Sequence, residues 1–301
     1  MLNRARLTAF DFLLYATVVV AWGFAWIGIH FQVGVVSPDV SIVWRFLLAG
    51  LVMIAIAAWR GDNLRYPLKL HARFALLGLL LFSLNFLFFY IAAETLPSGL
   101  LSIVFSLASF INVWLAAIFL RTPVDPRVVA GGLLGAVGMA AMFYPQFAGA
   151  DFKQGTLVAL LFCVAGTLAF CFGNIVSARL HREKIPVFAA SGYAMLYGSA
   201  AMAIYAALRG HAFIIEWSLH YLVGMLYLAL FASVVAFACY LTLLGRIGAD
   251  RAAYVTVLGP VVALAVSTFV ENFQWSIPIA LGLAAVIAGN VLVLRPSKHA
   301  Q

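Results

Sequence analysis

The chain has 301 residues, of which 65% are hydrophobic and 9% are charged, and its mean hydropathy is +1.08. These values exclude an ordinary soluble globular protein. The net charge of +8 does not call for a nucleic-acid partner, because the basic residues are spread over many loops.

Ten apolar segments follow one another along the chain. A bilayer core of about 30 Å needs about 20 helical residues, and each segment meets or nearly meets that length. The gaps are too short to hold an extramembrane domain, so the sequence predicts an all-α integral membrane protein with ten transmembrane helices. The segments, numbered first to tenth below, are 10–31, 40–59, 74–93, 100–120, 128–147, 156–178, 187–208, 222–244, 252–270 and 277–294.

Positive charge alternates between the gaps that separate these segments. If the gaps are assigned in turn to two sides, one side receives almost all of the 18 Lys and Arg residues. The other side receives only Lys153 and Arg209, and Arg45 lies inside the second segment. The positive-inside rule places the basic side in the cytoplasm. We therefore expect a multi-pass protein of the cell (inner) membrane with both termini cytoplasmic.

The second half of the chain resembles the first. One nearly constant shift places Trp22-Gly23 on Phe172-Gly173, Arg60-Gly61 on Arg209-Gly210, and the spaced glycines of the fifth segment on those of the tenth. This predicts two five-helix repeats, 1–148 and 151–301. Because five is odd, the second repeat must cross the membrane in the opposite sense. Such inverted repeats are typical of secondary transporters, in which a midplane site opens to either side.

Polar residues inside the segments are candidates for a substrate pathway. Ser98, just before the fourth segment, and Ser102, Ser106 and Ser109 within it share one helical face. This favours a polar pathway, with helix–helix packing as the alternative. Similar residues in the third and sixth segments allow both interpretations. The polar candidates for the pathway are Ser83, Asn85, Tyr90, Ser102, Ser106, Ser109, Thr167 and Asn174.

Aromatic and charged residues add candidates for walls and gates. Trp22 is deep enough to form a cavity wall, with bulk packing as the alternative. Tyr240 and Tyr254 lie near the cytoplasmic boundary, where they could form an inner gate or anchor the helices in the interface. Arg45 could contact substrate or a gate, or anchor the helix by extending to the external headgroups or by an interhelical salt bridge. Pro260 should loosen its helix and act as a hinge.

Several of these features resemble a known family. Trp22-Gly23, Arg45-Phe46-Leu47 followed by Ala49-Gly50, Gly259-Pro260 and Glu271 are similar to the drug/metabolite transporter superfamily, EamA-type permeases, and within it to amino-acid exporters of the YddG type. The resemblance implies a cavity lined by the first, third, fourth, sixth, eighth and ninth helices. We expect Glu271, like Arg45 and Tyr240, to act as a gate residue or a polar anchor. We expect the glycines of the fifth and tenth segments to lie where helices pack closely, either between the two repeats or between protomers.

The pathway chemistry indicates the substrate. The central stretches of the segments lack Asp, Glu and Lys, so neither a cation exporter nor a phosphate antiporter has an evident site. Hydroxyls, amides and aromatic rings suit a zwitterion, which predicts export of amino acids with aromatic or other apolar side chains. Other metabolites or drugs, such as purines and cationic compounds, are the alternative. We expect no catalytic residues, cofactor or metal, and partners limited to solute, bilayer and a weak homo-oligomer. An enzyme and a channel are disfavoured, since the six histidines are scattered and a filter-like segment is not evident.

Overall fold

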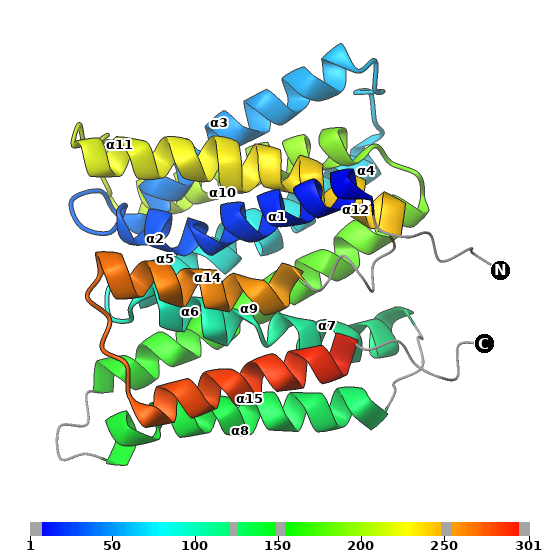
Figure 1. Ribbon diagram of the computed structural model, residues 1–301. Coiled ribbons are helices and arrows are strands. Elements are labelled where there is room, and N and C mark those ends of the chain that lie inside the picture. The colour runs from blue at the N-terminus through cyan, green and yellow to red at the C-terminus, as the bar shows by residue number, and fades with distance from the viewer. Residues whose placement is uncertain (1–7, 121–125, 149–153, 248–254, 295–301) are drawn as a thin grey trace.

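The computed structural model describes residues 8–120, 126–148, 154–247 and 255–294. Within these ranges all regular structure is helical, and the helices run roughly parallel in one bundle (Figure 1). The first half contains α1 (Ala9–Gly23), α2 (Ala25–His30), α3 (Pro38–Trp59), α4 (Leu68–Leu77), η1 (Gly78–Leu84), α5 (Asn85–Ala93), α6 (Ser98–Phe105), α7 (Ala108–Leu120) and α8 (Pro126–Ala148). The second contains α9 (Gln154–Arg182), α10 (Val187–Leu208), α11 (Leu219–Leu226), η2 (Tyr227–Val235), α12 (Ala236–Ile247), α14 (Val255–Val270) and α15 (Ile277–Leu294).

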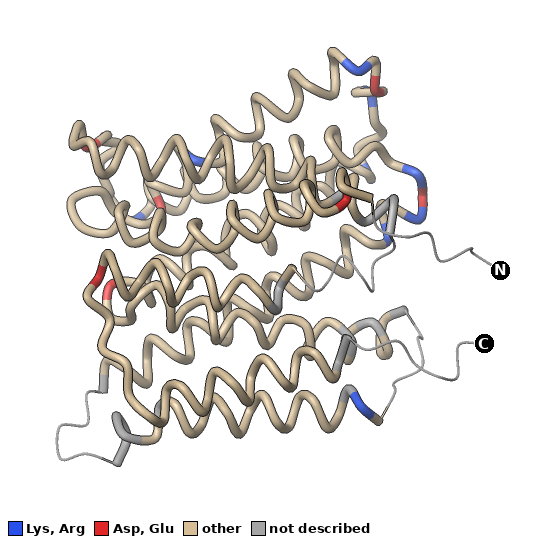
Figure 2. Tube along the Cα trace, in the orientation of Figure 1, with Lys and Arg blue, Asp and Glu red and all other residues tan. Residues whose placement is uncertain are grey.

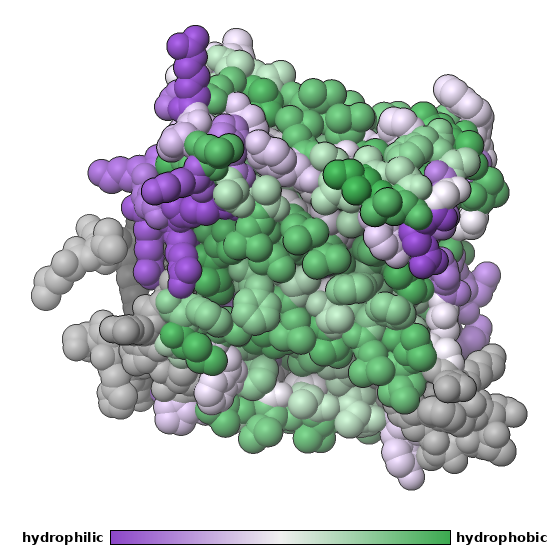
Figure 3. All heavy atoms as spheres, turned by 180° about the vertical axis from the view of Figure 1, so that it is seen from behind, coloured by the Kyte–Doolittle hydropathy of each residue, from purple (hydrophilic) through white to green (hydrophobic). Residues whose placement is uncertain are grey.

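Seven helical stretches of the described residues are long and apolar enough to cross a membrane. They coincide with the first four predicted segments and with the sixth to eighth. Three shorter apolar helices, Val129–Met142, Leu258–Val270 and Ile277–Leu292, coincide with the other three segments. Seen from behind, apolar side chains cover the middle of the bundle and hydrophilic ones gather toward its ends (Figure 3). The prediction of an all-α membrane protein is confirmed, whereas a count of ten spanning helices stays a prediction.

Two of the long stretches are broken and two contain a π-helical turn. The first breaks at Phe24, between α1 and α2, and the fourth breaks between α6 and α7. In η1 the Ser83 hydroxyl donates to the Gly78 carbonyl (3.1 Å), and in η2 Ser233 donates to Leu228 (2.8 Å). Both bonds reach five residues back, which is the spacing of a π-turn. Turns of this kind frequently occur at functional sites.

The glycines of the fifth and tenth segments lie at one helix–helix seam. α8 and α15 pack side by side at the edge of the bundle (Figure 1). A Cβ atom added at Gly138 would lie 2.7 Å from the Gly282 carbonyl oxygen, and one at Gly289 would overlap the Gly131 carbonyl. Only glycine therefore allows the two backbones to approach this closely. The seam joins the two halves of one chain.

Basic residues gather at one end of the bundle. Figure 2 shows most of the described Lys and Arg residues at the end where α1 begins and α15 ends. There Arg73 of α4 donates two hydrogen bonds to Glu183, which follows α9, at 2.6 and 2.8 Å. These bonds from the guanidinium lower the pKa of the Glu183 carboxyl below its usual value. Most of the described basic residues thus lie at one end of the bundle, as the alternation of charge between the sequence gaps predicted.

Candidate functional site

A cavity lies inside the bundle, where helices of both halves meet. It provides about 90 Å³ of room for the centres of water molecules, which accommodates several waters or part of a small solute. α1, α2, α3, η1, α5 and α6 line it from the first half, and α9, η2, α12 and α14 line it from the second. The lining residues are Trp22, Ala25, Trp26, Ile29, Arg45, Leu81, Phe82, Asn85, Phe86, Phe89, Ser102, Phe105, Phe170, Ala232, Phe237, Val255, Gly259 and Pro260.

The cavity walls are largely aromatic. The Trp26 ring lies 5.0 Å from that of Phe89 and 5.4 Å from that of Phe105, both centroid to centroid. Trp22 meets the edge of Phe237 at 5.7 Å, and its Nε1 donates to the Ala232 carbonyl in η2 (3.2 Å). Edge-to-face contacts and this hydrogen bond fix the rings in place. The walls therefore offer rigid apolar surface and π faces to a solute.

Arg45 brings a positive charge to this apolar cavity. Its side chain is 2% exposed, so it does not extend to the headgroups as the sequence allowed. The guanidinium lies over the rings of Phe86 (4.2 Å) and Phe46 (4.8 Å), and its Nη2 donates to Ser233 Oγ (3.3 Å). Tyr90 lies near enough to interact electrostatically. Within the part of the chain that the structure describes, the cavity lining contains no Asp, Glu or Lys, as the sequence predicted, and Arg45 is its one basic residue.

Asn85 is the second polar group of the cavity. It follows η1 directly and is 3% exposed. Its Nδ2 donates to the Leu81 carbonyl at 3.3 Å, whereas its Oδ1 has no hydrogen-bond partner among the described residues. Ser102 of α6, which is 2% exposed, also lines the cavity. A buried acceptor without a donor is costly, so this site would favour a solute that supplies one.

The structure brings only some of the predicted site residues together. Tyr254 lies outside the described residues, and eight other candidates do not line the cavity. Those that do line it are Trp22, Arg45, Asn85, Ser102 and Pro260, and those that do not are Ser83, Tyr90, Ser106, Ser109, Thr167, Asn174, Tyr240 and Glu271.

The serine face of the fourth segment is not continuous. Because the helix breaks between Phe105 and Ala108, Ser106 and Ser109 turn away from the cavity that Ser102 lines. Ser106 donates to the Ile103 carbonyl (2.6 Å), and Ser109 donates to the Asn290 side chain of α15. In this conformation these two serines bond within and between helices, and a pathway role for them stays a prediction.

Other predicted pathway residues also make contacts within the protein. Ser83 donates to the carbonyls of Gly78 and Gly198, and Tyr90 donates to the Gln32 side chain. In α9, Thr167 donates to the Cys163 carbonyl (2.8 Å). Asn174 of the same helix donates to Asn112 Oδ1 of α7 (3.3 Å). In this conformation these groups stabilise helices and helix pairs, which is the packing alternative.

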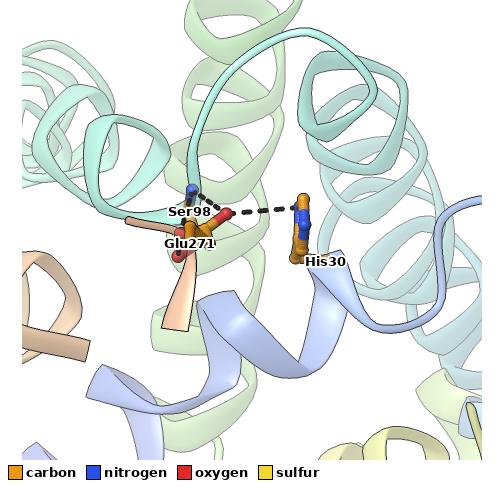
Figure 4. Close-up of polar contacts among 3 residues, drawn as sticks. All are labelled: His30, Ser98 and Glu271. Atoms are coloured by element: carbon orange, nitrogen blue, oxygen red, sulfur yellow. Dashed lines mark hydrogen bonds and ion pairs between the residues drawn. The ribbon is translucent and has the colours of Figure 1, made fainter. Parts of the chain in front are cut away.

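Glu271 forms a polar cluster with Ser98 and His30 (Figure 4). It follows α14, which ends at the end of the bundle opposite the basic one (Figures 1 and 2). It accepts hydrogen bonds from the backbone N–H and the hydroxyl of Ser98, at the first turn of α6. His30, the last residue of α2, has its Nδ1 3.3 Å from Glu271 Oε1, an ion-pair distance when the imidazole is protonated. Three helices that line the cavity thus meet at one carboxylate.

An apolar cluster lies on the other side of Trp22. It contains Leu14 and Val18 of α1, Leu243 of α12 and Val255 of α14, with Tyr240 packed against it. The Tyr240 ring lies 5.2 Å from that of Trp22. The expected gate residue Tyr240 thus lies next to the cavity wall rather than in it.

Sequence reasoning missed most of the aromatic wall. It selected Trp22 but not Trp26, Phe82, Phe86, Phe89, Phe105, Phe170 or Phe237. The signal was present, since the chain has 25 Phe and 7 Trp residues, but others of them, such as Phe12 and Phe231, are exposed on the outside of the bundle. Among the described residues, no group of three or more His, Cys, Asp or Glu side chains could hold a metal.

This bundle of apolar helices defines a polytopic membrane protein. The model of the EamA-like transporter family matches the chain twice, at residues 10–144 and 157–295. The chain therefore belongs to the EamA-like transporter family. It is a multi-pass protein of the inner membrane, as predicted, and its family and relatives are transporters rather than enzymes.

Relatives cover nearly the whole chain at low identity. The "Uncharacterized inner membrane transporter YedA" of Escherichia coli K12 is 26% identical over 93% of this chain and 89% of its own. The "Probable amino-acid metabolite efflux pump" of the same organism is 25% identical, over 95% of this chain and 96% of that protein's length. The "Probable biotin transporter" of Pseudomonas aeruginosa is 29% identical over 57% of this chain and 56% of its own. A crystal structure 20% identical in sequence matches 94% of this chain and 95% of its own with a TM-score of 0.69, and so shows the same fold.

Proposed function

We propose that this protein is a secondary transporter that exports amino acids with aromatic or other large apolar side chains. The observation that carries the proposal is the cavity, which has rigid aromatic walls, one buried cation and one unpaired amide oxygen. An apolar side chain gains from burial against such walls. The cavity also offers a donor and an acceptor to the two charged ends of an amino acid. The relative named as an amino-acid metabolite efflux pump supports this class of substrate.

Transport by alternating access rests on an inverted repeat, in which residues 1–148 and 151–301 form two five-helix units. Three observations support the repeat. The family model matches the chain once in each half. The π-turn serines Ser83 and Ser233 occupy corresponding positions in η1 and η2. The pairs α3–α10 and α8–α15, which consist of corresponding helices, pack against each other, as expected around a two-fold axis in the membrane plane.

Two groups of contacts, one on each side of the cavity, would close it to the outside and to the cytoplasm; we call each of them a closure. On the proposed external side, Glu271 holds α14, α6 and α2 together. On the proposed cytoplasmic side, where basic residues gather, the cluster around Val18 and Leu243 with Tyr240 separates the cavity from the helix ends. The break at Phe24 and Pro260 inside α14 are places where these helices could bend. Alternating access requires that one closure opens while the other stays shut.

A transporter of other metabolites or drugs, such as purines or cationic compounds, is the second candidate. Aromatic faces bind organic cations and stack on planar bases, and a relative is named as a biotin transporter. Arg45 argues against cations, because its charge would repel them inside a poorly screened cavity.

Counterflow in proteoliposomes tests the proposal. Purified protein is reconstituted with unlabelled leucine, phenylalanine, adenine or an organic cation inside, and entry of the same labelled compound is followed without a pH gradient. We expect saturable counterflow of leucine and phenylalanine. Exchange of adenine or the cation with none of either amino acid would contradict the proposed substrate.

A further inference from the structure

We propose that Arg45 is the binding site for the carboxylate of the substrate, and that Asn85 Oδ1 accepts a hydrogen bond from its ammonium group. This inference rests on the proposed function of the cavity as the transport site and names the chemistry of recognition there. It predicts that the two ends of an amino acid are recognised separately, by residues on α3 and α5.

The first argument is the missing counter-charge of Arg45. A guanidinium with 2% exposure in an apolar site is costly unless it is paired. The ion pairs among the described residues involve other groups, namely His30 with Glu271, Arg73 with Glu183, and His211 with Asp39. Arg45 is left with a charge that a bound anion can neutralise.

The second argument is the set of donors that Arg45 leaves unused. Nη2 reaches Ser233 and the Tyr90 side chain lies beside the guanidinium, but Nε and Nη1 have no acceptor among the described residues. Ser233 itself donates to the Leu228 carbonyl, so it is held by the π-turn of η2. A guanidinium kept only for packing would have its donors satisfied inside the protein. The unused N–H groups instead suit a carboxylate, which accepts several hydrogen bonds from an arginine.

The third argument is the rigid placement of the guanidinium. Its carbon lies 4.2 Å from the centroid of Phe86 and 4.8 Å from that of Phe46, and both contacts stabilise the cation. Phe86 also lines the cavity and follows Asn85 directly in α5. Arg45 and Asn85 therefore line the same cavity. A ligand with an anionic end and a donor end can contact both.

These features select one class of ligand. A monocarboxylate neutralises Arg45, and an adjacent ammonium adds a bond to Asn85 and contact with aromatic faces. A phosphate ester carries nearly two negative charges and would need a second cation, and Arg45 is the one Lys or Arg among the lining residues. An amide or an amine leaves Arg45 unpaired. We therefore expect the carboxylate to contribute more to affinity than the ammonium does.

Four compounds with the same side chain separate the two recognition steps. They are leucine, isocaproate, which lacks the amine, and leucinamide and isoamylamine, which lack the carboxylate. Each competes with radiolabelled leucine for counterflow into phosphatidylcholine liposomes, which offer Arg45 no anionic lipid headgroup. We expect leucine to compete best and isocaproate next, with the two carboxylate-free compounds weaker than leucine by at least about tenfold, the size of a charged hydrogen bond. Equal competition by leucine and leucinamide would overturn the proposal.

Variants assign the two ends to residues. Arg45→Gln should abolish the preference for leucine over leucinamide, and Arg45→Lys, which keeps the charge, should retain part of it. Asn85→Ala should weaken the competition by leucine and leave the competition by isocaproate unchanged. The matched control is Arg60→Gln, because Arg60 also lies over a ring, that of Phe188 at 5.0 Å, but outside the cavity. A leucine-to-leucinamide ratio unchanged in a folded Arg45→Gln protein would overturn the proposal.

A binding measurement separates this inference from the proposed function. If amino acids are not transported at all, the proposed function fails, and isocaproate binding is then measured by the thermal midpoint of the purified protein. An increase in the midpoint that is absent in Arg45→Gln and present in Arg60→Gln supports the carboxylate site. If isocaproate causes no increase in the wild-type protein, the inference fails as well.

Discussion

The carboxylate of Glu271 accepts hydrogen bonds from Ser98 at the first turn of α6, with 3.1 Å between each carboxylate oxygen and the Ser98 nitrogen. It thereby caps a helix of the first half from a residue of the second. A carboxylate is favourable there because the first N–H groups of a helix lack partners and carry partial positive charge. The pair therefore joins the two halves of the chain where α14 ends and α6 begins.

Loss of this pair should loosen the proposed external closure. Removing a helix cap costs about 1–2 kcal/mol, so Glu271→Ala should populate an open form more often. A cysteine placed at Ala25 in the cavity should then react with an external thiol reagent several-fold faster. Glu94→Ala is the matched control, since Glu94 is an exposed carboxylate just before α6. Equal labelling rates in the two variants would argue against a closing role for Glu271.

The seam between α8 and α15 should tolerate side chains at some glycines only. Gly138→Ala places a Cβ atom against the Gly282 carbonyl and should lower the free energy of unfolding by about 1–3 kcal/mol. In Gly135→Ala the nearest atom lies 3.8 Å away, on Leu107, so this variant should be neutral or gain from better helix propensity. Thermal midpoints in detergent compare the two, and a Gly138→Ala protein as stable as Gly135→Ala would disprove the close approach.

The Arg73–Glu183 pair should make a pH-dependent contribution to stability. The folded-state pKa of Glu183 is lowered by hydrogen bonds from Arg73, so the contribution is fully present above the ordinary carboxyl pKa of about 4.3. It is lost as the pH falls through the lower, folded-state pKa. Arg73→Gln should therefore lower the thermal midpoint slightly at pH 7 and match wild type in strong acid. Because the pair is exposed, the effect should shrink at high salt. A difference that grows on acidification would contradict this sign.

The proposed topology predicts the side from which two exposed positions react. In a background without Cys163, Cys171 and Cys239, we expect Lys69→Cys in α4 to react from the cytoplasm and Gln274→Cys, between α14 and α15, from outside. Both side chains are exposed. Labelling of Lys69→Cys in intact cells by an impermeant reagent would reverse the proposed orientation.

The sequence predicted the helices well because apolar length and loop charge are properties of segments. It could not predict the break after Phe105, since the residues around Ser106 do not include a proline or glycine. That break decided which serines face the cavity. The π-turns were equally hidden, because the sequence does not show which residues bond five positions back, as Ser83 does to the Gly78 carbonyl.

Arg45 shows a different limit. Its depth was compatible with a side chain that extends to the headgroups or one that turns inward, and sequence does not give the direction. Phe86, on another helix, and Ser233, far away in the chain, hold it inward. Long-range contacts of this kind appear only when helices are packed together.

Filling the cavity tests most directly the claim that solute passes through it. A Cβ atom at Gly259 would have no neighbour within 4 Å, although Gly259 lines the cavity, so Gly259→Phe should fold normally and occupy the binding space. Gly155→Phe, at the exposed start of α9, is the control. We predict that Gly259→Phe abolishes leucine counterflow in proteoliposomes with an unchanged thermal midpoint, while Gly155→Phe transports as wild type does. Full transport by a folded Gly259→Phe protein would contradict the account.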